Sequence, residues 1–352
     1  MTATRSSPKT GKRRADGRLT VAVTGPTGDI GRSLLRSLER SREIGRIAAM
    51  ARSPFNPEEA GLRKTEYRQA DVLDADTVAE VISGADVVVH LAFVIMGDLA
   101  ETTSINLQGS RNVFGAALDA GVKRLVYASS VAAYGFHDDN PELLTEDTPA
   151  RGTDRHYYSA QKAELEAALW KLLDGSRTEA YVFRPCIVAG PDALTLLESI
   201  PYIRLSERMP DAMLRALEFM PALKPVIPDP GVPFQLVHHD DVATAMRAAV
   251  LGRGEPGVFN LAAPGTMTMS DLAKALGWYS VPVPDLALGA VAELVARLPF
   301  VPAEAQWIES LRHPVLMDTA RARKQLGWRP RHDAAETLTA MVEAARSARV
   351  IR

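Results

Sequence analysis

Hydrophobic positions in the first half of the chain follow two alternating patterns. Short, nearly continuous apolar runs predict strands at 19–25, 46–51, 65–71, 85–92, 123–130 and 180–185. Apolar residues at helical spacing predict helices between them, at 29–40, 74–83, 102–120 and 157–174. Apolar strands that alternate with helices are typical of a parallel sheet covered on both faces. The pattern therefore predicts an α/β fold with a doubly wound parallel sheet.

The pattern changes after Pro185. Eight prolines between 191 and 233 predict loops and short helices rather than a second doubly wound sheet. Helical spacing returns at 241–252, 269–277, 304–311, 318–326 and 333–347, and the apolar run 258–262 could add a strand. We expect a basic disordered tail at 1–18, a first domain at 19–185, and a smaller, partly interwoven lobe at 186–352, some of whose segments return to the first domain.

The composition is that of an ordinary globular protein, with 46% hydrophobic and 24% charged residues. Residues 1–18 carry six cations and one anion, a net charge of +5, and the remaining 35 cations and 42 anions give −7. A body this acidic argues against general nucleic-acid binding, because phosphate contacts need a basic face. The single cysteine, Cys186, excludes an internal disulfide, and no run reaches the roughly 18 uncharged apolar residues of a membrane span. We expect a cytoplasmic protein without nucleic-acid or membrane partners.

Three glycines follow the first predicted strand and open the first predicted helix. Gly25, Gly28 and Gly31 lie in the segment TGPTGDIG. Glycines at such a turn let the backbone approach a pyrophosphate, whose charge the amides at the helix N-terminus then face. The spacing G-x-x-G-x-x-G differs from the common G-x-G-x-x-G fingerprint, and three glycines could also serve a tight turn alone. Their place between a strand and a helix favours a dinucleotide site.

The end of the second predicted strand bears on the choice of dinucleotide. An acidic residue there would bind the 2′-hydroxyl of NAD, but Arg52 and Ser53 stand there and no acid precedes Glu58. An arginine can pair with the 2′-phosphate of NADP, although it could also be an ordinary surface residue. We predict that NADP(H) is favoured over NAD(H).

Tyr158 and Lys162 are four residues apart on a predicted helix, which puts them on one face. A neighbouring ammonium favours the tyrosinate and is expected to lower the tyrosine pKa from about 10. Ser129 and Ser130 end a predicted parallel strand, where a hydroxyl can donate to a carbonyl oxygen as charge develops on it. Alternatively, a serine there caps the following turn. Together these residues indicate proton transfer at a carbonyl or alcohol.

These segments, with VVVHLA, NLQGSRNV, FRPCIVAGP, HHDDVA and DTARARKQLGWRP, occur in the order found in extended short-chain dehydrogenases/reductases. From 19 to 330 the chain resembles the NAD(P)-dependent epimerase/dehydratase family of that group. The resemblance implies a Rossmann fold, with the cofactor on the first domain and the substrate mainly on the C-terminal lobe. It implies Tyr158 as acid/base, Lys162 at the nicotinamide ribose, Ser130 as catalytic serine and Asn106 as support of the active-site water network.

The implied cofactor contacts form a longer set. They are Gly25, Thr27, Gly28, Asp29, Ile30, Gly31, Arg52, Ser53, Asp71, Val72, Leu91, Ala92, Phe93, Ser129, Tyr158, Lys162, Pro185 and Ile187.

Departures from the family pattern bear on the substrate. Nucleotide-sugar members often read R-x-F-N-x-x-G where this chain has FRPCIVAG, and often carry an arginine where this chain has Phe234. HLAF replaces the usual H-L-A-A and puts Phe93 near the cofactor. We therefore predict an oxidoreductase that moves a hydride between the nicotinamide and a secondary alcohol or ketone carbon of a small, fairly apolar substrate. The alternatives are a nucleotide-sugar epimerase/dehydratase with tightly bound NAD and, third, a non-catalytic cofactor-sensing protein.

Two further predictions concern a metal and the oligomeric state. His238, His239, Asp240 and Asp241 are consecutive, and on a strand such residues point to opposite faces, so we expect no metal site. By resemblance to the family, the segments 102–120 and 157–174 would pair two subunits in a homodimer. Their apolar stripes allow this but would equally suit packing onto the sheet.

Overall fold

The computed structural model describes residues 17–95, 102–154, 156–198, 200, 202–203, 224–284 and 313–351. Seven parallel strands form its central sheet, in the order β10-β6-β5-β4-β1-β2-β3. The strands are β1 (Leu19–Thr24), β2 (Ile44–Ala51), β3 (Thr65–Gln69), β4 (Val87–His90), β5 (Arg124–Ala128), β6 (Glu179–Pro185) and β10 (Gly257–Leu261). The predicted doubly wound parallel sheet is confirmed, and the fold is of the Rossmann type.

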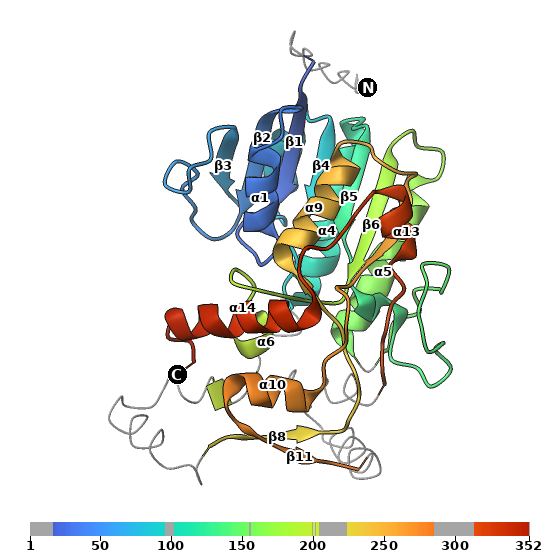
Figure 1. Ribbon diagram of the computed structural model, residues 1–352. Helices are drawn as coiled ribbons and strands as arrows, with labels where there is room; N and C mark the ends of the chain where they lie inside the picture. Colours follow the sequence, from blue (N-terminus) through green and yellow to red (C-terminus); the bar gives the residue numbers. More distant parts are fainter. Residues whose placement is uncertain are drawn as a thin grey trace, which may run out of the picture.

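Helices cover both faces of this sheet (Figure 1). On one face lie α1 (Gly31–Glu39) and α9 (His239–Val250), and on the other lie α2 (Ala75–Ile82), α4 (Ser110–Asp119) and α5 (Tyr157–Leu173). Val21 and Val23 of β1 belong to the first core, and Ala22 belongs to the second. Successive strand residues thus enter opposite cores, which explains why the strands read as continuous apolar runs.

The predicted elements in the described part of the chain start and end within two residues of the observed ones. One has a different internal structure: the segment 102–120 opens with a π-helix, η1 (Ser104–Gly109), before α4 begins. The apolar run 258–262 is β10, which returns to the sheet beside β6. The predicted helix at 304–311 and the tail up to residue 16 lie outside the described residues.

Most of the remaining elements gather at the carboxyl ends of the sheet strands (Figure 1). They include two parallel two-stranded sheets, β7 (Ile187–Ala189) with β9 (Leu236–His238) and β8 (Val226–Asp229) with β11 (Tyr279–Pro282). The helices α6 (Thr195–Glu198), α10 (Met269–Leu276) and α14 (Ala334–Ser347) share a third apolar core with β7, β8 and β9. Two more elements are η2 (Val131–Tyr134), which follows β5, and α13 (Ala320–Gln325), which packs near β10. The division into a domain at 19–185 and a lobe at 186–352 stays a prediction.

The strand order locates the crevice of the fold. The chain continues from β1 to β2 and β3 on one side, then crosses to β4 on the other side of β1. At such a switch point the loops leaving two adjacent strands diverge, and ligands bind outside the carboxyl ends. The structure thereby brings the turns after β1, β4 and β5 to one edge of the sheet. No helix among the described residues is both long and apolar enough to cross a membrane.

Candidate active site

The turn between β1 and α1 is built by three glycines with different constraints. Gly25 has φ +75°, and a Cβ there would come within 2.6 Å of the amide nitrogen of Ala92. A Cβ on Gly31 would lie 2.5 Å from the carbonyl oxygen of Gly25. On Gly28 the nearest atom would be 3.7 Å away. The protein's own packing therefore requires the first and third glycines, whereas the second leaves open space of the kind a pyrophosphate needs.

The other residues of this turn differ in their surroundings. Thr27 and Ile30 are half-buried. The carboxylate of Asp29 accepts a hydrogen bond from Thr195 Oγ1 of α6 at 2.7 Å, and burial raises its pKa. Ile30 gives α1 no side-chain cap, and the first turn carries no acid. The amides at this helix N-terminus are thus arranged as an anion-binding site would be, while the one acid of the turn is hydrogen-bonded to α6.

The predicted adenosine end lies at the carboxyl ends of β2 and β3. Arg52 and Ser53 directly follow β2 and are exposed. Asp71, after β3, accepts from the amide of Leu73 at 2.9 Å, and Val72 is buried. A Cβ on Gly109 would lie 2.4 Å from Val72 Cγ2, so a glycine is needed there to pack η1 against this turn. The structure places both predicted pairs at the same edge of the sheet.

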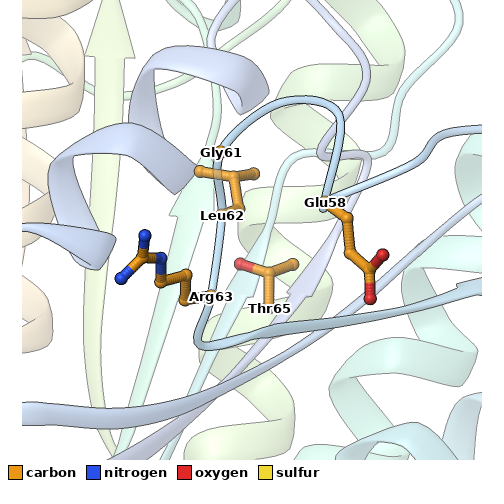
Figure 2. Close-up of a pocket in the computed structure, with 5 residues that line it drawn as sticks. All are labelled: Glu58, Gly61, Leu62, Arg63 and Thr65. Carbon is orange, nitrogen blue, oxygen red and sulfur yellow. The ribbon is translucent and has the colours of Figure 1, made fainter.

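One pocket, of about 470 Å³, lies on the loop between β2 and β3 (Figure 2). Its lining residues are Glu58, Gly61, Leu62, Arg63 and Thr65. None of these belongs to the predicted catalytic or cofactor set, so this pocket is not the candidate active site.

Three predicted catalytic side chains meet where β5 ends and α5 begins. Tyr158 and Lys162 are buried and one turn apart on α5. The hydroxyl of Tyr158 is hydrogen-bonded to that of Ser130. Ser130 lies two residues after the end of β5 and is the N-cap residue of η2. The Nζ of Lys162 donates to the carbonyl oxygen of Ala128 at 2.8 Å. The structure thus brings a proton donor, a second hydroxyl and an ammonium together at a strand end.

The expected lowering of the tyrosine pKa is wrong for this structure. Burial raises the pKa of Tyr158 to about 12, although the bond to Ser130 acts in the opposite direction. Burial also lowers the pKa of Lys162 to about 7, while Glu166 acts against that shift. The lysine is directed at a carbonyl, with its Nζ 5.8 Å from the centre of the tyrosine ring. Desolvation is the largest cause of both shifts.

The segment after β4 connects the glycine turn with this centre. The amide of Leu91 donates to the carbonyl oxygen of Thr24, and Ala92 is the backbone neighbour that Gly25 accommodates. The ring of Phe93 lies 3.7 Å from Lys162 Nζ and meets the ring of Tyr158 edge to face at 5.4 Å. Phe93 therefore covers the lysine, as a cation–π partner, at the centre of the site.

Asn106 lies in the π-helix η1, a kind of helix distortion that is frequent at functional sites. Its side chain accepts from the amide of Val94 at 2.8 Å and donates to the carbonyl of Val94 and to Gln161 Oε1, both at 2.9 Å. Tyr157 donates its hydroxyl to the carbonyl of Ile95. Both residues fix the segment after β4, and Tyr157 thus has a different task from its neighbour Tyr158.

Two buried charged residues at this end were missed by the sequence interpretation. The hydroxyl of Ser129 donates to Glu166 Oε1 at 2.5 Å, so it is turned inward rather than toward the crevice. Glu166 forms an ion pair with Arg184 of β6. The available signal was the spacing of Tyr158, Lys162 and Glu166, which are four residues apart in succession on one helix face.

The other predicted residues near β6 have simpler surroundings. Pro185 ends β6, and Ile187 begins β7 and is half-buried. Burial raises the pKa of the Cys186 thiol, which keeps the thiol protonated and unsuited as a nucleophile.

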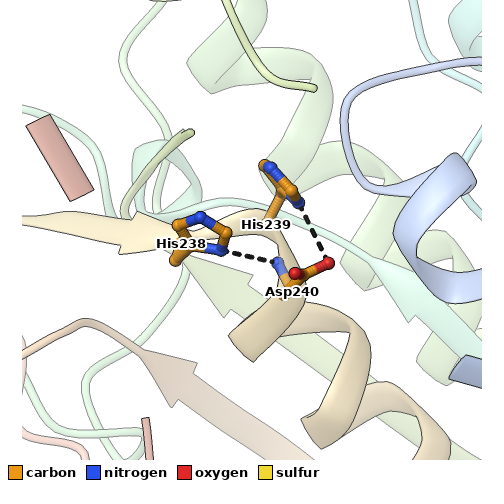
Figure 3. A group of neighbouring side chains, drawn as sticks. All are labelled: His238, His239 and Asp240. Carbon is orange, nitrogen blue, oxygen red and sulfur yellow. Dashed lines mark hydrogen bonds and ion pairs between the residues drawn. The ribbon is translucent and has the colours of Figure 1, made fainter. Parts of the chain in front are cut away.

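His238, His239 and Asp240 place their ligand atoms within 4.8 Å of one another (Figure 3). His239 already uses both ring nitrogens: Nδ1 lies 2.6 Å from Ser33 Oγ, and Nε2 accepts from the amide of Asp192 at 3.1 Å. Nδ1 of His238 accepts from the amide of Asp240 at 3.1 Å. These hydrogen bonds connect α1, α9 and the 190–192 turn. They favour a structural role for the three residues rather than a metal site.

Apolar side chains surround Tyr158. Ala132, Phe136, Tyr157 and Tyr158 form a buried cluster, against which Phe93, Ile95 and Val315 pack. Phe234, at the position where nucleotide-sugar members often carry an arginine, packs against the third apolar core and pairs with Met267. These contacts leave the described surroundings of Tyr158 largely apolar.

Known proteins resemble this chain over about half of its length or more. An uncharacterized protein of Mycobacterium tuberculosis is 28% identical over 321 residues, which cover 88% of this chain and 80% of that one. Cinnamoyl-CoA reductase 1 of Petunia hybrida is 29% identical over 49% of this chain and 55% of its own length. Human 3 beta-hydroxysteroid dehydrogenase type 7 is 31% identical over 45% of each chain. The last two matches therefore span about half of each protein.

Solved structures share the fold. The crystal structure of gox2253 has a TM-score of 0.73 and 24% identity, covering 95% of this chain and 99% of that one. MoeE5, in complex with UDP-glucuronic acid and NAD, has a TM-score of 0.67 and 20% identity, covering 94% and 99%. The profile of the NAD dependent epimerase/dehydratase family matches residues 21–262. The chain therefore belongs to the NAD dependent epimerase/dehydratase family.

Proposed function

We propose that this family member is an oxidoreductase that transfers a hydride between a nicotinamide cofactor and a secondary alcohol or ketone carbon of a small, fairly apolar substrate. The observation that carries the proposal is the contact of Tyr158 with Ser130, with Lys162 one turn along α5. These are the groups that proton exchange at a carbonyl requires. The edge of the sheet that holds them also holds the glycine turn.

The residues present fit a dinucleotide. Open space at Gly28 and the uncapped N-terminus of α1 would accept the pyrophosphate. Asp71 and Val72 would lie at the adenine, and Lys162 at the nicotinamide ribose. We further propose that NADP(H) is favoured, because Arg52 and Ser53 are exposed directly after β2, where an arginine suits a 2′-phosphate.

When bound, the nicotinamide supplies or accepts the hydride. In the reduction direction, Ser130 donates a hydrogen bond to the substrate carbonyl oxygen, and Tyr158 gives its hydroxyl proton to that oxygen. Lys162, when protonated, stabilises the phenolate that remains on Tyr158. In oxidation the phenolate takes the alcohol proton. Burial raises the pKa of Tyr158 to about 12, so the hydroxyl is protonated at neutral pH before the cofactor and substrate bind.

The apolar substrate is supported by what surrounds Tyr158. Phe93, Phe136 and Val315 lie in or against its cluster, and Phe234 replaces a phosphate-binding cation. The test is a screen of aliphatic, aromatic and sterol-like ketones with NADPH and NADH, followed by nicotinamide absorbance. The proposal is supported if the unmutated protein oxidises NADPH in the presence of a ketone and Tyr158→Phe does not. Consumption that persists in Tyr158→Phe would contradict it.

A second candidate is a nucleotide-sugar epimerase or dehydratase with tightly bound NAD. It is favoured by neighbours of the same fold that were solved with UDP-sugars and NAD, such as MoeE5. Product analysis with UDP-glucose decides between the two: conversion of the sugar without net change in nicotinamide absorbance would support this candidate.

We also propose a homodimer through α4 and α5, located in the cytoplasm. Val113, Leu165 and Leu169 are buried against the sheet, so they are not free for a partner. Trp170 and Leu172 of α5 remain 39% and 43% exposed and would lie at the interface. Light scattering at micromolar concentration tests this, with Trp170→Glu as the variant expected to be monomeric; a monomeric unmutated protein would contradict it.

A further inference from the structure

Two charged side chains that the proposed chemistry does not use lie buried beside the catalytic residues. Glu166 follows Lys162 by one helical turn and Tyr158 by two, so the three share a face of α5. Glu166 and Arg184 are 1% and 4% exposed. Nε of Arg184 donates to Oε1 of Glu166 at 3.0 Å, and its Nη2 donates to Oε2 at 2.6 Å. The pair is held by two hydrogen bonds between α5 and β6.

The pair also reaches the end of β5. Ser129 Oγ donates to Oε1 of Glu166 at 2.5 Å. The residue before it, Ala128, accepts the hydrogen bond from Lys162, and the residue after it is Ser130. Glu166 therefore holds the short segment that carries both the acceptor of the lysine and the catalytic serine.

The charge of Glu166 acts on Lys162 as well. Burial lowers the pKa of Lys162, and Glu166 is the charged group that opposes this shift. The titratable neighbours are neutral near pH 7: burial lowers the pKa of His90 to about 3 and raises those of Tyr127, Tyr134 and Tyr158 above 10. Arg184 faces Glu166 and lies over the ring of Tyr134 at 4.3 Å.

Stability is a weak reason to bury such a pair, because apolar residues of similar volume often stabilise a core as well or better. We propose that Glu166 and Arg184 are a positioning pair for the reaction: Glu166 holds Ser129 and sets a negative charge beside Lys162, and Arg184 compensates that charge in the core. The inference rests on the proposed function, in which Lys162 and Ser130 serve Tyr158.

The test removes both charges together. Glu166→Gln alone would leave the Arg184 guanidinium buried without its carboxylate, which is strongly destabilising. The double variant Glu166→Gln/Arg184→Met keeps the volumes similar and leaves no unpaired charge. Ser129→Ala is the matched control, since it removes the hydroxyl and keeps both charges. Circular dichroism and thermal melting establish that each variant is folded.

The first measurement needs no substrate. Lysine labelled with ¹³C at Cε is followed by NMR against pH, and the Lys162 signal is assigned from its absence in Lys162→Met. We expect the proton affinity of Lys162 to fall about tenfold in the double variant, because the nearby carboxylate is gone. In Ser129→Ala it should be unchanged. An unchanged lysine titration in the folded double variant would overturn the proposal.

The second measurement uses the alcohol whose ketone consumes NADPH in the screen. In the double variant, the acid limb of kcat for alcohol oxidation should move to higher pH, because a less protonated lysine stabilises the phenolate less. A purely structural role would lower kcat equally at every pH and would contradict the proposal. If Tyr158→Phe retained full activity, the proposed function would fail, whereas the lysine titration would still decide whether Glu166 sets the charge of Lys162.

Discussion

The two ends of the candidate site depend on different features of the sequence: one on glycines, which lack side chains, and the other on buried polar side chains. At the turn between β1 and α1, the proposed cofactor binding depends on the absence of side chains: Gly25 and Gly31 leave no room for a Cβ, whereas the nearest atom to a Cβ on Gly28 would be 3.7 Å away. At the end of β5, the proposed catalysis depends on polar and charged side chains whose burial costs free energy. Lys162 is 3% exposed, and burial lowers its pKa to about 7. The glycine turn therefore depends on backbone conformation, whereas the end of β5 depends on buried charged groups.

This difference determines how each end should respond to change. A backbone turn fails when an added atom collides with a neighbour, so the loss appears in folding or in ligand affinity. A buried acid–base group can be removed with little harm to the fold, and the loss appears in rate and in pH dependence. The following predictions test this contrast.

The largest effect is expected from Tyr158→Phe. It removes the proton donor but fills the same space, so kcat should fall by about 10²–10⁴-fold while the melting temperature changes little. Steady-state kinetics with NADPH measure this. Tyr157→Phe is the control: it loses a hydrogen bond to Ile95 and should reduce kcat much less. Equal losses of kcat in the two variants would contradict the assignment of Tyr158 as the proton donor.

Gly31→Ala and Gly28→Ala form a matched pair at the other end. The Cβ at residue 31 would lie 2.5 Å from backbone atoms, so we expect a loss of about 3 kcal/mol in the free energy of unfolding. At residue 28 the nearest atom is 3.7 Å away, so stability should be kept and dinucleotide affinity should fall. Urea unfolding and fluorescence titration with NADPH separate the two. Unchanged affinity in Gly28→Ala would argue against a pyrophosphate at this turn.

Lys162→Met should stabilise the fold in a pH-dependent way. The pKa of Lys162 is lowered in the folded state to about 7 from 10.5. Below pH 7 the lysine is charged in both states and its burial cost is fully present. Between about pH 7 and 10.5 Lys162 is protonated in the unfolded chain and neutral in the folded one. The free energy of unfolding therefore rises with pH, and the cost of burying the charged lysine disappears.

The hydrogen bond to Ala128 is lost in Lys162→Met. With this loss included, the free energy of unfolding of the variant should exceed that of the unmutated protein by about 2 kcal/mol at pH 6 and by little at pH 10.5. Urea unfolding at the two pH values measures this. An equal gain in the free energy of unfolding at both pH values would show that Lys162 is not charged while buried in the folded protein.

Arg52→Ala should have the smallest and most selective effect. In the unmutated protein NADP(H) should bind about ten- to a hundredfold more tightly than NAD(H), from hydrogen bonds to a charged phosphate. The variant should lose most of this difference and keep its affinity for NAD(H). Dissociation constants from fluorescence titration measure it. Tighter binding of NAD(H) by the unmutated protein would show that Arg52 has no part in the choice.

The fold was largely predictable, and the reasons are local. Continuous apolar strands and amphipathic helices located the seven strands of the central sheet and the helices that cover it, because each strand residue enters one of two cores. The short elements β7, β8, β9, β11, α6 and η2 were not located. The spacing of Gly25, Gly28 and Gly31 indicated the turn, because glycine is needed where backbones meet. Tyr158, Lys162 and Ser130 were found through their positions at a strand end and on one helix face.

The electrostatics of the site could not be predicted in the same way. The sequence places an ammonium four residues from a tyrosine, but the pKa values depend on burial, which comes from Phe93 and other distant segments. The partner of Glu166 is an arginine on another element, and no local pattern pairs them. The π-helix at Asn106 likewise follows from packing against the segment after β4, rather than from helical propensity.

The return of β10 to the sheet has a consequence for how the protein can be divided. The chain leaves the sheet after β6 and comes back as β10, and α9, which lies between them in sequence, covers one face of the sheet. A fragment cut after residue 185 would therefore lose a helix over its core and expose the edge of β6 to other strands. Proteolytic nicking between the two halves should thus release aggregating material rather than a folded cofactor-binding piece.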